Sequence, residues 1–191
     1  MCSMKEEEKD PRRWTVLETK YIIRRPWLTA RCDKVMHPSG VVNDEYYVLE
    51  YPDWVNVIAR TKDGHFVMIR QYRHGLGRTC FELVAGVIDP GDESPEAAAK
   101  RELWEETGFG GGTWHEISVI SANPSTTNNL THCFVAEGVE KVSTQHLEPT
   151  EDITVHLLSK EEVAQLLKND EIKQALMAAP LWKYFATHGL L

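Results

Sequence analysis

The stretch from Gly86 to Phe109, GVIDPGDESPEAAAKRELWEETGF, constrains the fold of this 191-residue chain more than any other. Ser94 suits the N-cap of a helix, and Pro95 suits its first position, where the missing N–H costs nothing. Good helix formers follow, and Gly108 suits the residue just past the C-terminus. The sequence therefore predicts a helix from Pro95 to about Thr107, entered from a strand through a glycine-bounded loop.

Three carboxylates share one face of this expected helix. Glu102, Glu105 and Glu106 are spaced i, i+3 and i+4, which brings their side chains together. Such pairs repel by roughly 0.2–0.5 kcal/mol each, so one interpretation is a solvated acidic face on which Arg101 relieves Glu105. The other is a site for hard divalent cations, which prefer carboxylate and carbonyl oxygens. The preceding strand, CFELVAGVI, favours the cation site because its end offers backbone oxygens to the same ions.

These residues resemble the signature of the Nudix hydrolases, the Nudix box: Gly, five residues, Glu, seven residues, then Arg-Glu-apolar-any-Glu-Glu-any-Gly-apolar. Arg101–Phe109, RELWEETGF, matches the second half at every position. Six residues separate Gly86 from Glu93, so either the loop carries one extra residue or Asp92 takes the place of the glutamate. The resemblance implies a mixed α+β fold, an α/β/α sandwich, and a pyrophosphohydrolase that uses Mg²⁺, with Mn²⁺ as the alternative ion.

The resemblance also implies roles for single residues. Glu102 and Glu106 are expected to bind metal together with the backbone carbonyl of Ala85. Glu105 is expected to be a further ligand or an acceptor behind the ligands, and Arg101 is expected to hold a box glutamate in place.

Among Nudix hydrolases the chain is most similar to the ADP-ribose pyrophosphatases, whose general base lies on an acidic loop before the last strand. Here that loop is His146–Asp152, HLEPTED. Glu151 is the candidate for metal contact and Glu148 the candidate base, and an ordinary solvated loop is the alternative. The predicted catalytic set is therefore Glu148 and Glu151 with Glu105 and Arg101.

Four residues are predicted to bind substrate. Pro124 lies sixteen residues after Gly108, as in members that cleave ADP-ribose, although a simple turn explains it equally. The segments QYR and FELVAG resemble strands of the same subfamily, which assigns Arg73 to a phosphate and Glu82 to an adenine or a ribose hydroxyl. The resemblance also implies that an aromatic residue of one subunit covers the adenine of the substrate bound by its partner, and Trp27 is the candidate for that role, with packing as the alternative.

The chain is expected to divide near Pro52. Residues 1–52 contain no expected helix and form a small antiparallel β extension, and residues 53–191 form the Nudix domain. Two or three strands alone are marginal in water, so the extension is expected to pack on the main domain or on another subunit, and the resemblance to the ADP-ribose pyrophosphatases implies a homodimer. Its expected strands are Thr15–Ile23, Trp27–Met36 and Glu45–Tyr51.

In residues 53–191 the pattern predicts strands on both sides of the box helix, followed by two C-terminal helices. One helix runs from Lys160 to about Asn169, and the other from Glu171 to about Thr187 with a bend or restart at Pro180. The expected strands are Trp54–Thr61, His65–Arg73, Cys80–Ile88, Trp114–Ser121, Leu130–Glu137 and Ile153–Leu158.

Charge and composition exclude several classes of protein. The formal charge of −8 and the lack of a basic block argue against an extended nucleic acid as partner, RNA caps included. Four scattered cysteines without a CxxC motif indicate free thiols and a cytoplasmic protein. No apolar run reaches the roughly 18 residues of a membrane-spanning helix.

The leading hypothesis is hydrolysis of a nucleotide sugar, most simply ADP-ribose to AMP and ribose 5-phosphate. A GDP-mannose or other NDP-sugar pyrophosphatase is the alternative of the same class. A sensor that binds a nucleotide sugar without cleaving it is the alternative of another class, and it is disfavoured because Arg101, Glu102, Glu105 and Glu106 are all present.

Overall fold

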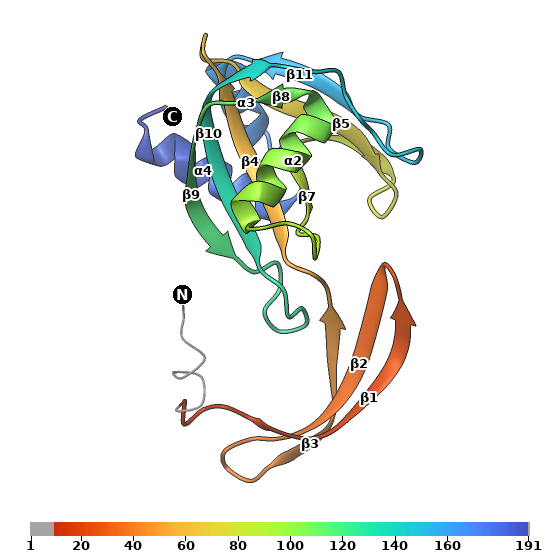
Figure 1. The fold of residues 1–191 in the computed structure, drawn as a ribbon. Helices are drawn as coiled ribbons and strands as arrows, with labels where there is room; N and C mark the ends of the chain where they lie inside the picture. Colours follow the sequence, from red (N-terminus) through yellow and green to blue (C-terminus); the bar gives the residue numbers. More distant parts are fainter. Residues whose placement is uncertain (1–9, 191) are drawn as a thin grey trace. The chain divides into compact units, whose positions relative to one another are not determined.

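The computed structural model describes residues 10–190, which fall into two compact units (Figure 1). One unit contains the chain up to Tyr51 together with Asn123–Asn129, and the other contains Pro52–Ala122 and the chain from Leu130 onward. The short stretch Asn123–Asn129 therefore belongs to the N-terminal unit although it follows the box helix by many residues.

The first unit is an antiparallel sheet of three strands in the order β1-β2-β3, formed by Thr15–Arg25, Leu28–Met36 and Val42–Glu50. This confirms the expected N-terminal antiparallel strands. Asn123–Asn129 joins the β3 side, where Leu49 N–H donates to Thr126 O at 2.7 Å and the Tyr46 hydroxyl donates to Ser125 O at 2.8 Å.

The second unit is built on a mixed sheet with the strand order β11-β5-β4-β10-β8. The neighbours β4 and β10 are parallel, whereas β5 is antiparallel to both β4 and β11. Three more strands extend the sheet: β6 pairs with β5, β7 with β4, and β9 with β10. The bounds are β4 Trp54–Thr61, β5 Phe66–Arg73, β6 Arg78–Glu82, β7 Val84–Val87, β8 Phe109–Gly110, β9 Thr113–Ile120, β10 Thr131–Lys141 and β11 Thr154–Leu158.

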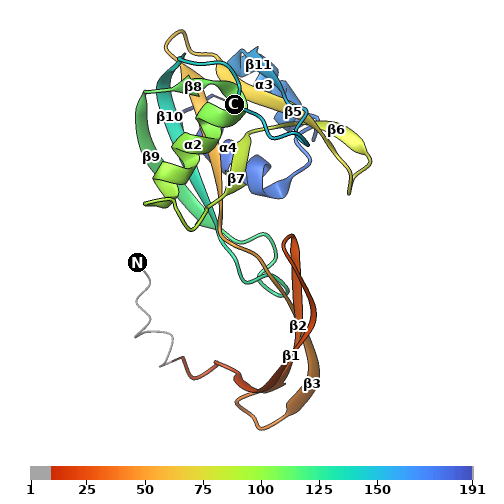
Figure 2. The same cartoon turned by 45° about the vertical axis from the view of Figure 1, so that its right-hand side comes forward.

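Helices cover both faces of this sheet, as Figure 2 shows. Alternate residues of a strand face opposite sides, so Val55 and Val57 of β4 pack in one core with Leu103 of helix α2, Pro95–Thr107. Ile58 packs in a second core with helix α3, Lys160–Lys168, and helix α4, Ala175–Thr187. The expected α/β/α sandwich is confirmed.

The expected strand Cys80–Ile88 is instead two strands that break at Leu83. The first of them, β6, pairs with β5, and the second, β7, pairs with β4. The chain changes neighbours at this point, so one unbroken ladder cannot continue. This change brings β7 alongside β4, where it faces helix α2.

Helix α4 also differs from expectation, because it begins at Ala175 and passes through Pro180 without a restart. A proline lacks the N–H that would bond to the carbonyl four residues earlier. That carbonyl, Leu176 O, accepts instead from Asn56 Nδ2 of β4 at 2.8 Å. The side chain of Asn56 thus replaces the helical hydrogen bond that Pro180 removes.

Cys32, Cys80 and Cys133 are free thiols, and each lies in a strand as expected. Cys2 lies outside the described residues. None of the helices within residues 10–190 combines the length and the apolar character that spanning a membrane requires.

Candidate active site

Helix α2 is fixed at both ends by local sequence. Ser94 Oγ accepts from Ala97 N–H at 3.1 Å, and Pro95 opens the first turn. Gly108 ends the helix with φ +68°, a left-handed conformation that suits glycine, and its N–H donates to Trp104 O at 2.8 Å. The predicted helix bounds and caps are confirmed.

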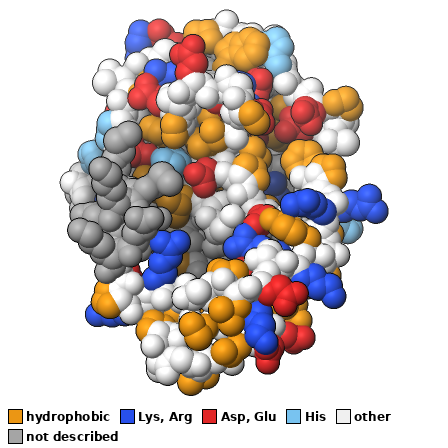
Figure 3. Space-filling model, turned by 60° about the horizontal axis from the view of Figure 1, so that its bottom comes forward, with side chains coloured by type: hydrophobic (Ala, Val, Ile, Leu, Met, Phe, Trp, Pro, Cys, Tyr) orange, Lys and Arg blue, Asp and Glu red, His pale blue; other side chains and the backbone are white. Residues whose placement is uncertain are grey.

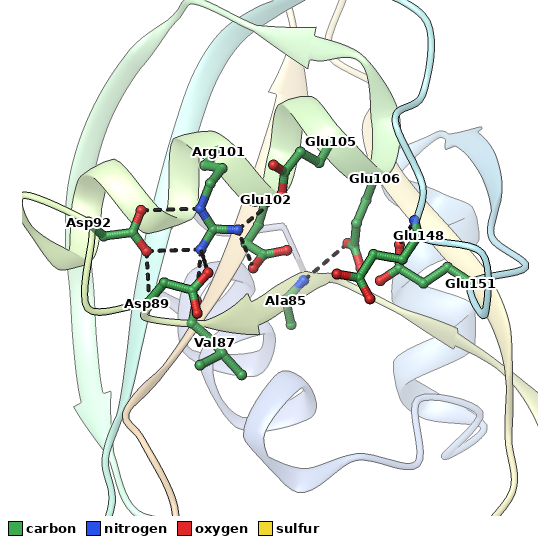
Figure 4. A network of polar contacts seen from close by, with 10 residues as sticks. All are labelled: Ala85, Val87, Asp89, Asp92, Arg101, Glu102, Glu105, Glu106, Glu148 and Glu151. Carbon is green, nitrogen blue, oxygen red and sulfur yellow. Dashed lines mark hydrogen bonds and ion pairs between the residues drawn. The ribbon is translucent and has the colours of Figure 1, made fainter. Parts of the chain in front are cut away.

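Two box carboxylates face the backbone of β7, as Figure 4 shows. Glu106 is 4% exposed, and its Oε2 accepts from Ala85 N–H at 3.4 Å. The carboxylate of Glu102 lies against Gly86, where an added Cβ would stand 2.1 Å from Glu102 Cδ. Gly86 therefore leaves the space that this carboxylate occupies.

Both carboxylates are held where a negative charge is costly. Burial raises the pKa of Glu102 to about 7, although Arg101 acts in the opposite direction. Burial also raises the pKa of Glu106 well above its usual value, and the charges of Glu102 and Glu151 raise it further. The electrostatic field at this place therefore favours a cation.

Arg101 connects the helix to the loop before it. Its guanidinium donates to Asp92 through Nε at 3.1 Å and through Nη2 at 2.9 Å, and Nη2 also donates to Val87 O at 2.9 Å. Nη1 donates to Glu102 Oε1 at 2.9 Å and to Glu105 Oε2 at 3.0 Å. The hydrogen bond to Asp92 raises the pKa of Arg101, so this cation stays charged.

The contacts of Arg101 also help to explain the irregular spacing of the Nudix box. Asp92 contacts Arg101 and has a nearly buried side chain, whereas Glu93 is exposed. The arrangement matches the alternative in which Asp92 takes the place of the first glutamate, and the additional residue follows it. Asp89, which was not singled out from the sequence, also lies 3.5 Å from Arg101 Nη2.

The acidic loop His146–Asp152 precedes β11 and carries Glu148 and Glu151. Glu148 N–H donates to Glu151 Oε2 at 2.9 Å, and Glu151 N–H donates to Glu148 O at 3.0 Å. In Figure 4 both side chains extend from this loop on the Glu106 side of the site. The charge of Glu151 reaches Glu102 and Glu106, since it raises the pKa of each.

These residues fit a hard divalent cation. Glu102 and Glu106 of α2 lie close enough to Glu151 of the acidic loop for its charge to raise the pKa of both, and carboxylate oxygens are the donors that Mg²⁺ and Mn²⁺ prefer. Among the described residues, no three His, Cys, Asp or Glu side chains are close enough together to hold an ion by themselves. Water, substrate oxygens or a backbone carbonyl such as that of Ala85 would complete the coordination.

A recess of about 220 Å³ opens beside Ala85, Gly86 and Val87. Arg73 lies in its wall and donates to Glu82 through Nε at 2.8 Å and through Nη2 at 2.5 Å. Glu82 is 2% exposed and also accepts from Gln71 Nε2 at 3.1 Å. The other residues that line the recess are Trp54, Val55, Asn56, Thr131, Gln174, Leu176 and Met177.

The predicted site residues are divided between the two units. Ala85, Arg101 and the glutamates described above belong to the second unit, as do Arg73 and Glu82. Trp27 and Pro124 belong to the first unit, and Trp27 is 83% exposed. The roles of Trp27 and Pro124 toward a substrate remain predictions.

Comparison with known proteins gives two family matches. The NUDIX domain matches residues 50–179, and the nucleoside diphosphate sugar hydrolase N-terminal domain matches residues 14–49. An ADP-ribose pyrophosphatase of Bacillus subtilis is 31% identical over 132 residues, which cover 69% of this chain and 71% of that protein. An ADP-ribose pyrophosphatase of Mycobacterium tuberculosis is 31% identical over 151 residues, covering 78% and 72%.

A solved structure of an ADP compounds hydrolase has a similar fold. Its TM-score to this chain is 0.78 at 24% sequence identity, and the match covers 96% of this chain and 100% of that one.

Proposed function

The chain belongs to the Nudix hydrolase family, and from that premise we propose that it hydrolyses the diphosphate of a nucleoside diphosphate sugar, with ADP-ribose as the preferred substrate. Nudix hydrolases need divalent cations, and we propose Mg²⁺ for this one. Water attacks one phosphorus, the bond from that phosphorus to the bridging oxygen breaks, and the products are AMP and ribose 5-phosphate.

The observation that carries this proposal is the pair of carboxylates that face β7, the buried Glu106 beside Ala85 and the partly buried Glu102 against Gly86. Together with Ala85 O and Glu151 they would hold Mg²⁺, which supplies neutralisation of phosphate oxygens and a lower pKa for the attacking water. Such neutralisation matters because a diphosphate repels nucleophiles through its own charge.

Different residues of the protein have different roles in this reaction. Glu148 accepts the proton of the attacking water, and Glu151 lies close enough to the box for its charge to act on Glu106. Arg101 keeps Glu102 and Glu105 in fixed positions through its hydrogen bonds. Arg73, which lines the recess and donates to the buried Glu82, would bind a phosphate of the substrate.

The test is a substrate panel of ADP-ribose, GDP-mannose, UDP-glucose and diadenosine polyphosphates, each with and without Mg²⁺. Phosphatase-coupled release of phosphate is the readout, and ADP-ribose is expected to be cleaved fastest. Faster cleavage of GDP-mannose would favour the alternative substrate class. Binding of nucleotide sugars without any release of phosphate would contradict hydrolysis and indicate a sensor.

Variants of the carboxylates sharpen the test. Glu151→Gln is expected to lower kcat at least about tenfold, as loss of a group that acts on charge in the transition state would. Glu96→Gln is the control, because it makes the same chemical change at a surface glutamate of α2, which pairs with Lys100 at 2.5 Å. A wild-type rate for Glu151→Gln, with an unchanged melting temperature, would remove Glu151 from the mechanism.

We further propose that the first unit mediates a homodimer. Every residue of β1 is exposed, and its apolar side chains include Val16 at 55% and Ile22 at 54% exposure. Figure 3 shows exposed hydrophobic side chains, in orange, among charged ones. In such a dimer Trp27 would cover the adenine of the partner's substrate, and Pro124 would shape the loop on its ribose side. A stable monomer in sedimentation at micromolar concentration would contradict the dimer.

A further inference from the structure

The C-terminal end of α2 is covered by the segment Lys141–His146, which we call the clasp. The last carbonyls of a helix have no partner within it and need a donor from elsewhere. Three of them accept a hydrogen bond from the clasp: Glu105 O from His146 N–H at 2.8 Å, Glu106 O from Gln145 Nε2 at 2.8 Å, and Thr107 O from Lys141 Nζ at 2.6 Å. The clasp therefore binds the backbone of the helical turn that carries the site carboxylates.

One side chain of the clasp also links the two ends of the acidic loop. Gln145 Nε2 donates a second hydrogen bond, at 3.1 Å, to Ile153 O. Gln145 lies just before the acidic loop and Ile153 lies just after it. A single amide thus joins the two ends of the loop and ties both to the carbonyl of Glu106.

The entry to the acidic loop is held by a second contact. The rings of Trp104 and His146 stack with their centroids 4.2 Å apart and their planes 15° apart. Leu147, the next residue, packs against the core between α2 and the sheet. Packing and hydrogen bonds therefore connect α2 to the acidic loop that carries Glu148 and Glu151.

We propose that Gln145 is a positioning residue, which holds the acidic loop and its Glu151 in place relative to Glu106. Gln145 carries no charge and acts through the loop rather than on the substrate. Catalytic groups lose much of their effect when they move by about 1 Å, so loosening the two ends of the loop should reduce turnover more than substrate binding. The kinetic part of this inference rests on the proposed function, and the structural part does not.

The structural part is tested by hydrogen–deuterium exchange without any substrate. Gln145→Leu removes both hydrogen bonds from the amide, so exchange in residues 146–153 is expected to become about tenfold faster or more. Peptides from α4 should keep their exchange rates, which separates this effect from global destabilisation. Gln165→Leu is the control, because Gln165 Nε2 donates to Asn169 Oδ1 at 2.8 Å on the exposed side of α3.

The kinetic part is tested by a double-mutant cycle with Glu151→Gln. Gln145→Leu alone should lower kcat for ADP-ribose about tenfold with KM within about threefold. Added to Glu151→Gln it should lower kcat no further, because both changes remove the same group from its place. Unchanged exchange in residues 146–153, or additive effects on kcat, would overturn the proposal. If the wild-type protein cleaved no nucleotide sugar, the proposed function would fail while the exchange experiment still decided the role of Gln145.

Discussion

Gly86→Ala tests the approach of Glu102 to strand β7. The added Cβ would lie 2.1 Å from Glu102 Cδ and Oε1 and 2.5 Å from Oε2. Unbonded carbon atoms normally stay about 3.5–4.0 Å apart, so the carboxylate has to retreat by more than about 1 Å. A displacement of that size at a catalytic centre costs about 100-fold in rate, and we expect kcat for ADP-ribose to fall by about that factor.

The fold should tolerate the same substitution, because the obstructed group is the end of a flexible side chain. A strained rotamer costs about 0.5–1.5 kcal/mol, which lowers the melting temperature of a domain of this size by only a few degrees. We expect the Mg²⁺ concentration for half-maximal activity to rise. Gly91→Ala is the control, since an added Cβ there meets nothing within 4 Å. A rate for Gly86→Ala within about threefold of wild type would refute this account of Glu102.

Two further outcomes follow from the side-chain contacts. Asp92→Asn should lower kcat about 10- to 100-fold, because it weakens the charge-assisted hydrogen bond to Arg101, which is worth about 1.5–3 kcal/mol. Glu93→Gln should leave kcat unchanged. Equal losses in both variants would show that Asp92 does not take the place of the first box glutamate. Asn56→Leu should cost about 1–3 kcal/mol in urea unfolding, since it leaves the carbonyl of Leu176 without its donor. The cost should shrink when Pro180→Ala is added, and an undiminished cost would show that Asn56 does not substitute for the missing helical bond.

Elements with local signals were predictable from the sequence. Helix α2 begins and ends where Ser94 and Gly108 indicate, because caps depend on residues within one turn. The break at Leu83 had no such signal, since it depends on which strands lie beside the chain on each side. Helix α4 passes through Pro180 because of an asparagine that is more than a hundred residues away, which no local pattern reveals.

The candidate site shows the same division. The shared face of Glu102 and Glu106 follows from helical spacing alone. The burial of Glu106, and the contact of Arg101 with Asp92 rather than with Glu93, depend on how α2 packs on β7. Gln145 carries no motif at all, and only the tertiary structure shows that its amide reaches Glu106 O.

The assignment of Asn123–Asn129 to the first unit has a practical consequence for anyone who shortens the gene. The polypeptide passes from one unit to the other three times, so a fragment that starts at Pro52 keeps this stretch but loses β3, to which it binds. Leu49 and Tyr46 would no longer supply donors to Thr126 and Ser125. Low stability or solubility of such a fragment would then reflect the loss of these hydrogen bonds. When domains are exchanged between relatives, the N-terminal strands and Asn123–Asn129 should be transferred together.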